Sequence, residues 1–198
     1  MSKPLKVLSL FAVLLALSGC AGKNFVRPEQ GAFKLGVTNY AAVTQQLGQP
    51  VREGSLVKNE KNIKSITYAY ASTGGEPLEE GVIPARAMVY YFLNDTLIGQ
   101  EFVSSFKSDN SNFDDTKIPM IVKGKTTRAE VIQILGRPSG TCIPPIVKAT
   151  SGEALGYAYS TTRGGAFSGF KFFRKALLVS FDERDQVSDL EFSSSGNK

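Results

Sequence analysis

The chain has 198 residues, of which 42% are hydrophobic and 21% charged, and its formal net charge at pH 7 is +5. Such a mild excess of cations is typical of neither a nucleic-acid-binding nor a strongly acidic protein, so we expect no nucleic-acid partner. Histidine is absent and cysteine occurs only at Cys20 and Cys142, which excludes Ser-His and Cys-His nucleophile pairs and argues against zinc or copper sites. We therefore expect no catalytic residue, no metal, no cofactor and no small-molecule substrate.

The first twenty residues have the pattern of a secretory signal that ends at a lipidated cysteine. Lys3 and Lys6 precede an unbroken apolar run over residues 7–17, and two small residues then lead to Cys20. The run is too short for a membrane-spanning helix, which needs about 20 residues. The ending Leu-Ser-Gly-Cys resembles the lipobox of bacterial lipoproteins, which implies cleavage before Cys20 and acylation of its thiol. An ordinary secreted protein with a chance cysteine is the alternative.

The residues around Cys20 also predict where the protein is held. Ala21 follows the cysteine where aspartate would imply retention in the inner membrane, so the resemblance implies anchorage at the outer membrane, facing the periplasm. Two or more acyl chains anchor a protein stably, because each buried CH₂ contributes about 0.8 kcal/mol. We expect residues 20–32 to form a tether between this anchor and the folded part of the chain.

Once Cys20 carries lipid, Cys142 is the one remaining cysteine and no internal disulfide can form. It lies in the apolar sequence Thr-Cys-Ile-Pro-Pro, which favours a small buried side chain. A reactive thiol is the alternative.

An internal repeat is the most informative feature after the signal. Residues 36–50 (GVTNYAAVTQQLGQP) and 124–138 (GKTTRAEVIQILGRP) are identical at eight of fifteen positions, at an offset of 88 and without a gap. Tyr-Ala-Tyr recurs further along, at 68–70 and 157–159. Matches in the same order along the chain indicate a duplicated unit.

Each copy is predicted to begin with a short helix. In the second copy, residues 127–130 (TRAE) fit a capping box and Gly136 supplies the left-handed position that ends the helix. In the first copy, Thr38 or Asn39 is the expected N-cap and Gly48 ends the helix.

Alternating apolar residues predict three strands after each helix. The predicted strands are 63–72, 87–93 and 98–105 in the first copy and 155–161, 176–181 and 187–194 in the second. We therefore expect an α+β fold of two tandem repeats, each a short helical segment packed on a three-stranded antiparallel β-meander. The expected organisation is a lipoprotein signal peptide at 1–19, a tether at 20–32, repeat 1 at 33–105, a linker at 106–119 and repeat 2 at 120–195.

These motifs resemble the SmpA/OmlA (BamE-like) family of small outer-membrane lipoproteins, which assist the assembly of β-barrel proteins. The matching positions are Gly36, Thr38, Val43, Leu47, Gly48 and Pro50 in the first copy, and Gly124, Thr126, Val131, Leu135, Gly136 and Pro138 in the second. The pattern also resembles the repeat of β-lactamase-inhibitor-like proteins, in which two units stand in tandem. The BamE-like family usually has one unit and often a Trp in its strand, whereas this chain has two copies and no Trp.

Residues 163–175 (RGGAFSGFKFFRK) interleave cations with phenylalanines, as suits a membrane interface or a protein hot spot. The candidate contact residues are Arg163, Phe167, Phe170, Lys171, Arg174 and Lys175. The alternative is a glycine-rich hairpin whose phenylalanines enter the core. The corresponding segment of the first copy, 74–86, carries three glutamates. The two loops either recognise different partners, or each other between molecules, or have simply diverged as solvated loops.

Two functions follow from these expectations. The first is a non-enzymatic outer-membrane lipoprotein, anchored in the membrane by its lipid, that binds a protein partner as a scaffold in envelope or β-barrel assembly. The alternative is a periplasmic inhibitor or sensor lipoprotein that binds a hydrolase through its tandem sheets.

Overall fold

The computed structural model of the protein describes residues 22–148, 152–165 and 168–196. The predicted signal peptide and Cys20 lie outside these ranges. The elements in chain order are α2 (Tyr40–Leu47), β1 (Arg52–Lys58), β2 (Lys61–Ala71), β3 (Ala85–Leu93), β4 (Thr96–Ser104), the 3-10 helix η2 (Asp115–Met120), α3 (Arg128–Leu135), β5 (Gly140–Cys142), β6 (Ala154–Gly165), β7 (Gly169–Phe181) and β8 (Val187–Gly196).

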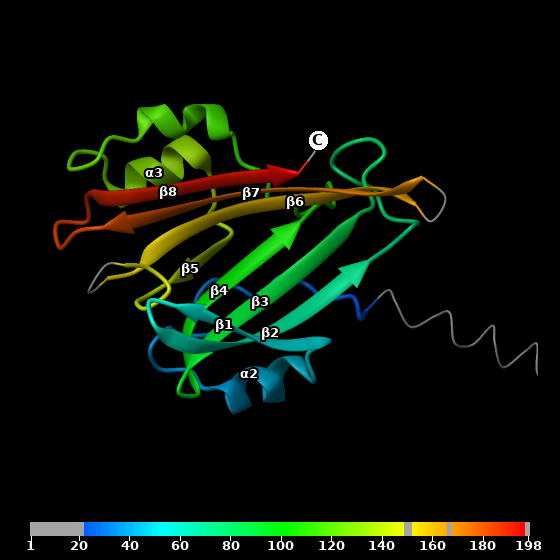
Figure 1. The fold of residues 1–198 in the computed structure, drawn as a ribbon, viewed down its shortest axis with the longest axis horizontal. Helices are drawn as coiled ribbons and strands as arrows, with labels where there is room; N and C mark the ends of the chain where they lie inside the picture. The colour runs from blue at the N-terminus through cyan, green and yellow to red at the C-terminus, as the bar shows by residue number, and fades with distance from the viewer. Residues whose placement is uncertain (1–21, 149–151, 166–167, 197–198) are drawn as a thin grey trace, which may run out of the picture.

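The strands form one antiparallel sheet of eight strands in sequence order, from β1 to β8 (Figure 1). The prediction of an α+β fold built from two repeats, each on its own three-stranded meander, is therefore wrong. The sequence patterns did not predict two of the strands, β1 and the three-residue β5. β5 pairs with β4 on one side and with β6 on the other, so it joins the two halves of the chain into a single sheet.

The junction at β5 depends on a very close approach of two backbones. Gly140 pairs with Glu101, and a Cβ atom at position 140 would lie 1.8 Å from the carbonyl oxygen of Gln100. Only glycine fits here, because every other residue would clash with the backbone of β4. A short strand with a glycine and no apolar alternation carries little sequence signal, which explains why it was missed.

The helix boundaries predicted from capping residues are confirmed. Asn39, not Thr38, caps α2 by accepting a hydrogen bond from the backbone N–H of Ala42 at 2.9 Å. Thr127 and Glu130 form the full capping box at the start of α3. At the other ends, Gly48 and Gly136 have φ angles of 80° and 83°, in the region that favours glycine.

The recurrent Tyr-Ala-Tyr sequence supplies a matched contact to each helix. The hydroxyl of Tyr68 donates to the carbonyl oxygen of Gly48 at 2.8 Å, and that of Tyr157 donates to the carbonyl oxygen of Gly136 at 3.1 Å. Both carbonyls belong to a helix end, where the helix itself offers no partner. The sequence repeat thus survives as a repeated local contact, although the strands belong to one sheet.

Both helices cover the same face of the sheet, which is called the convex face below. α2 packs over the strands of the first half and α3 over those of the second, and Figure 1 shows them on the outside of the curled sheet. The bulkiest buried side chains lie on this face. They include Ile66, Tyr68, Met88, Tyr90, Phe92 and Phe102 under α2, and Leu155, Tyr157, Leu177, Val179 and Phe181 under α3.

The segment predicted as a tether is fastened to the fold from Gly22 onward. Gly22 forms an isolated antiparallel bridge with Tyr70 at the end of β2. Arg27 then donates to the carbonyl oxygens of Pro138 and Ser139, at 2.8 and 2.9 Å. Burial, together with the charge of the nearby Arg137, lowers the pKa of Arg27 to about 10, which leaves it charged at neutral pH. The N-terminal segment of the first half therefore holds the second half in place.

Candidate functional site

Neither α2 nor α3 packs on the opposite face of the sheet, which is called the concave face; there Ile146 and Val147 cover Cys142 and Leu178. Its floor is built mainly of small side chains: Ala69, Ala71, Ala85, Ala87, Val89, Tyr91, Glu101, Val103, Cys142, Ser160, Thr162, Arg174, Ala176 and Leu178. Because side chains alternate between the two faces of a strand, Ala87 and Val89 of β3 alternate with the large Met88 and Tyr90 of the convex face. The sheet curls toward this side, since Leu56 of β1 and Glu191 of β8 line the same hollow.

Two hollows lie along the concave face. One, of about 370 Å³, extends from Ala69 and Ala87 to Thr162, and the other, of about 490 Å³, from Tyr91 to Leu178. Glu101 and Arg174 line both hollows. The hollows therefore adjoin at this pair, and the concave face forms a trough that crosses from one half of the chain to the other.

An ion pair stands in the middle of this trough. Arg174 Nη2 lies 2.7 Å from Glu101 Oε1, and their side chains are 45% and 22% exposed. Burial alone would lower the pKa of Arg174, but the attraction of Glu101 and their hydrogen bond raise it overall, so the guanidinium stays charged. The pair presents both a donor and an acceptor to anything that enters the trough.

Cys142 lies on the concave face beside this pair and is buried, as its apolar sequence setting predicted. Burial first, and the negative charge of Glu101 second, raise the pKa of its thiol to about 12. The thiol is therefore protonated at neutral pH and fills space as a small apolar group.

The predicted contact residues of 163–175 do not form one surface. Lys175 is only 4% exposed and lies on the convex face, where its ammonium group contacts the Phe113 carbonyl oxygen and, at 2.5 Å, Asp115 Oδ1. A membrane or partner contact at Lys175 is therefore wrong. Arg174, the next residue, points to the opposite face of β7 and belongs to the trough. Phe167 lies outside the described residues.

Arg163 is also engaged within the molecule. Its Nη2 lies 2.6 Å from Glu79 Oε2, and the hydroxyl of Tyr159 donates to the same carboxylate at 2.9 Å. The backbone N–H of Ile83 donates to the carbonyl oxygen of Thr162 at 2.8 Å, so the acidic loop lies directly against β6. The opposite charges of the two loops hold them together inside one chain. Recognition between molecules is not needed to explain them.

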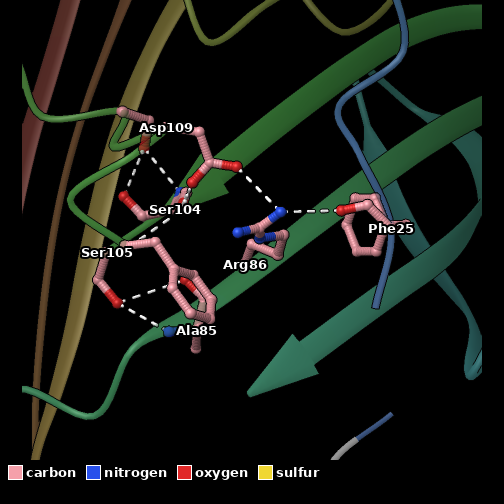
Figure 2. A network of polar contacts seen from close by, with 8 residues as sticks. Phe25, Ala85, Arg86, Ser104, Ser105 and Asp109 are labelled. Carbon is pink, nitrogen blue, oxygen red and sulfur yellow. Dashed lines mark hydrogen bonds and ion pairs between the residues drawn. The ribbon is translucent and has the colours of Figure 1, made fainter. Parts of the chain in front are cut away.

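A second, largely buried cation on the convex face, Arg86, matches Lys175. Arg86 contacts Asp109 Oδ2 at 3.2 Å and donates to the carbonyl oxygen of Phe25 at 2.9 Å (Figure 2). It also lies over the ring of Phe106. The hydroxyl of Ser104 donates to the same Asp109 at 2.7 Å. Arg86 and Lys175 occupy corresponding positions, each paired across the sheet with the second Tyr of a Tyr-Ala-Tyr sequence. Each cation fastens one part of the segment 106–119, so these charges serve the fold.

Phe170 and Lys171 are exposed at the outer end of the β6–β7 hairpin. Sequence reasoning missed Glu101 as a trough residue, because its partner Arg174 lies 73 residues away. The small residues that alternate with large ones along β3 were the available signal. Among the described residues, no group of three or more His, Cys, Asp or Glu could hold a metal ion, and no helix is both long and apolar enough to cross a membrane.

Comparisons with known proteins give little further guidance. No family model and no curated protein matches the chain, and so the resemblance to the SmpA/OmlA family has no support there. Among solved structures, the chain is similar to a Streptococcus mutans protein described as a "putative beta-lactamase inhibitor protein", with 12% identity and a TM-score of 0.38. The match covers 92% of this chain and 96% of that chain. A likeness this weak carries no argument about function, which has to come from the site itself.

Proposed function

We propose that the protein is a non-enzymatic, lipid-anchored binding protein that holds a protein partner in its concave trough. One observation carries this proposal: large side chains and both helices close the convex face, whereas small side chains leave two adjoining hollows on the concave face. A surface kept hollow across both halves of the sheet is suited to receiving a protruding group of a partner.

The occupant we propose is a loop that protrudes from a folded protein and has a polar tip. The two hollows adjoin and run across the sheet as one open trough, a shape that suits an extended segment of a partner. At its middle, the half-exposed Arg174 can pair with an acidic or carbonyl group of the loop while Glu101 accepts from a donor. Charge complementarity at one point, with small apolar side chains around it, fits a loop tip better than a flat surface.

This proposal follows the inhibitor or sensor hypothesis more closely than the assembly hypothesis. A curled trough accepts a loop from one compact partner, such as a periplasmic hydrolase. The role in β-barrel assembly rests on the sequence resemblance alone, and no contact in the described residues favours it.

The test fills the trough and leaves the rest of the surface unchanged. Ala87→Trp places an indole in the trough, and Ile132→Trp is the matched control, because Ile132 is 38% exposed on α3 of the convex face. The tagged full-length chain is used to capture proteins from detergent-solubilised envelopes. We expect the control to retain a partner that the Ala87→Trp variant loses. Equal recovery by both variants would contradict the proposal.

The lipid anchor at Cys20 is a proposal of its own, based on the signal sequence. Cys20→Ser removes the thiol that would be acylated and leaves the described fold untouched. We expect this variant to leave the outer-membrane fraction while keeping its unfolding transition. A variant that still fractionates with the outer membrane would show that Cys20 is not the anchor.

A further inference from the structure

The outer end of the β6–β7 hairpin exposes two phenylalanines. Phe170 and Phe172 are 53% and 63% exposed, and their rings contact each other at 6.4 Å between centroids. The pairing of β8 with β7 runs out to Gly196 opposite Phe173, so both phenylalanines lie beyond that pairing, on the overhanging part of the hairpin. Two adjacent exposed rings cost hydration free energy unless another apolar phase receives them.

The N-terminal segment leaves the fold at the same end of the sheet. Gly22 is bridged to Tyr70 at the end of β2, and Gly22 and Thr162 line the same hollow. Thr162 is the cross-strand partner of Phe172. Figure 1 shows the start of the described chain, the tip of β2 and the β6–β7 hairpin at one end of the molecule. Cys20 lies two residues before Gly22, a reach of about 7 Å at most.

The charges at this end are arranged to be compatible with an anionic surface. Two of the three glutamates of the acidic loop are neutralised, Glu79 by Arg163 at 2.6 Å and Glu76 by Lys107 at 2.7 Å, and the third, Glu80, is exposed. Lys171, between the two phenylalanines in sequence but on the other face of β7, is exposed, as is Lys23 beside the exit point. Rings flanked by ammonium groups are the composition that binds the headgroup layer of a bilayer containing anionic lipid.

We propose that this end of the molecule lies on the membrane, with Phe170 and Phe172 in the headgroup layer and Lys171 near anionic lipid phosphates. The occupant of this surface is the lipid bilayer and not a protein. The short distance from Gly22 to Cys20 keeps the hairpin at the bilayer, and the hairpin in turn orients the sheet. This contact rests on the proposed anchor at Cys20. It adjoins the end of the trough at Thr162, but neither phenylalanine lines a hollow, so it can fail while partner binding at Arg174 stands.

The absence of tryptophan from the chain makes a direct test possible. Phe172→Trp introduces one fluorophore at the proposed contact, and Phe192→Trp is the control, because Phe192 is also a half-exposed phenylalanine, at 45%, but lies along β8 opposite Leu177. The full-length chain is purified from membranes and reconstituted into phosphatidylethanolamine–phosphatidylglycerol vesicles that contain brominated lipid. We expect a blue-shifted emission and several-fold stronger quenching at position 172 than at position 192. Equal, weak quenching at both positions would overturn the proposal.

A second variant tests the electrostatic part. Lys171→Glu is added to Phe172→Trp, and quenching is compared in vesicles with phosphatidylglycerol and in vesicles of phosphatidylcholine alone. We expect the substitution to reduce quenching several-fold in the anionic vesicles and much less in the neutral ones. An unchanged signal in the anionic vesicles would contradict a role for Lys171 at the lipid surface.

Discussion

Arg174 and Lys175 are adjacent cations on β7, but their side chains lie on opposite faces of the sheet and have different roles. Lys175 is buried on the convex face and holds Phe113 and Asp115, whereas Arg174 stands half exposed in the concave trough and pairs with Glu101. The convex face uses its charges and aromatic rings to close the structure. The concave face keeps its side chains small and its one central ion pair within reach of solvent. Substitutions on the first face should therefore change stability, and substitutions on the second should change binding.

The largest effect is expected at the junction on which this comparison depends. Gly140→Val would place a side chain against the Gln100 carbonyl, 1.8 Å from the position of its Cβ, and β5 could no longer join the two halves. Overpacking of this kind costs about 1–3 kcal/mol, and the loss of strand pairing adds to it. Urea unfolding should show a much lower midpoint, or two separate transitions. An unchanged midpoint would show that the sheet does not depend on this junction.

The next largest effect should come from Lys175→Met, which keeps the apolar stem and removes the charge. The Asp115 carboxylate and the Phe113 carbonyl then lose a buried partner, which we expect to cost about 2 kcal/mol, less than for a fully buried pair because Asp115 is 36% exposed. Chemical denaturation measures this loss. A variant as stable as the wild-type protein would contradict the expectation that substitutions on the convex face lower stability.

A smaller and matched effect is expected from Tyr68→Phe and Tyr157→Phe. Each change removes one hydrogen bond to the C-cap residue of a helix and leaves the ring in place, at a cost of about 1 kcal/mol. Thermal unfolding of the two single variants compares the halves directly. Strongly unequal losses of stability would show that the two hydrogen bonds, although alike in geometry, do not stabilise the two halves equally.

The smallest effect on stability is expected for Arg174→Ala. A half-exposed ion pair contributes up to about 1 kcal/mol, so the unfolding midpoint should hardly move. Binding of the captured partner should nevertheless weaken several-fold, as surface plasmon resonance with the purified proteins can measure. Unimpaired binding would place the partner elsewhere than over this pair.

Local structure could be predicted from the sequence because its signals are local. Asn39, the Thr127–Glu130 capping box and the two terminal glycines each act within a few residues, and the structure has both helices where these residues predict them. The strand joining the halves could not be predicted, since Gly140 is explained only by its distance from a backbone forty residues earlier.

The site was harder to predict than the helices, because its contacts join residues that are far apart in the sequence. Lys175 reads as a surface cation until Asp115, 60 residues earlier, is seen beside it. The acidic and basic loops likewise read as separate surfaces, whereas Arg163 and Glu79 pair with each other across 84 residues. Composition shows that charge is present, but only the register of the sheet decides which charges meet.

Binding in the trough is tested by a photo-crosslinking residue at Val89, on the concave face, and in a second chain at Ile132, on the convex face. Each full-length chain is irradiated in intact cells and its adducts are identified by mass spectrometry. We expect one dominant protein adduct from position 89 that is lacking from position 132. The same adduct from both positions, or an adduct from position 132 alone, would contradict the claim that the trough is the binding site.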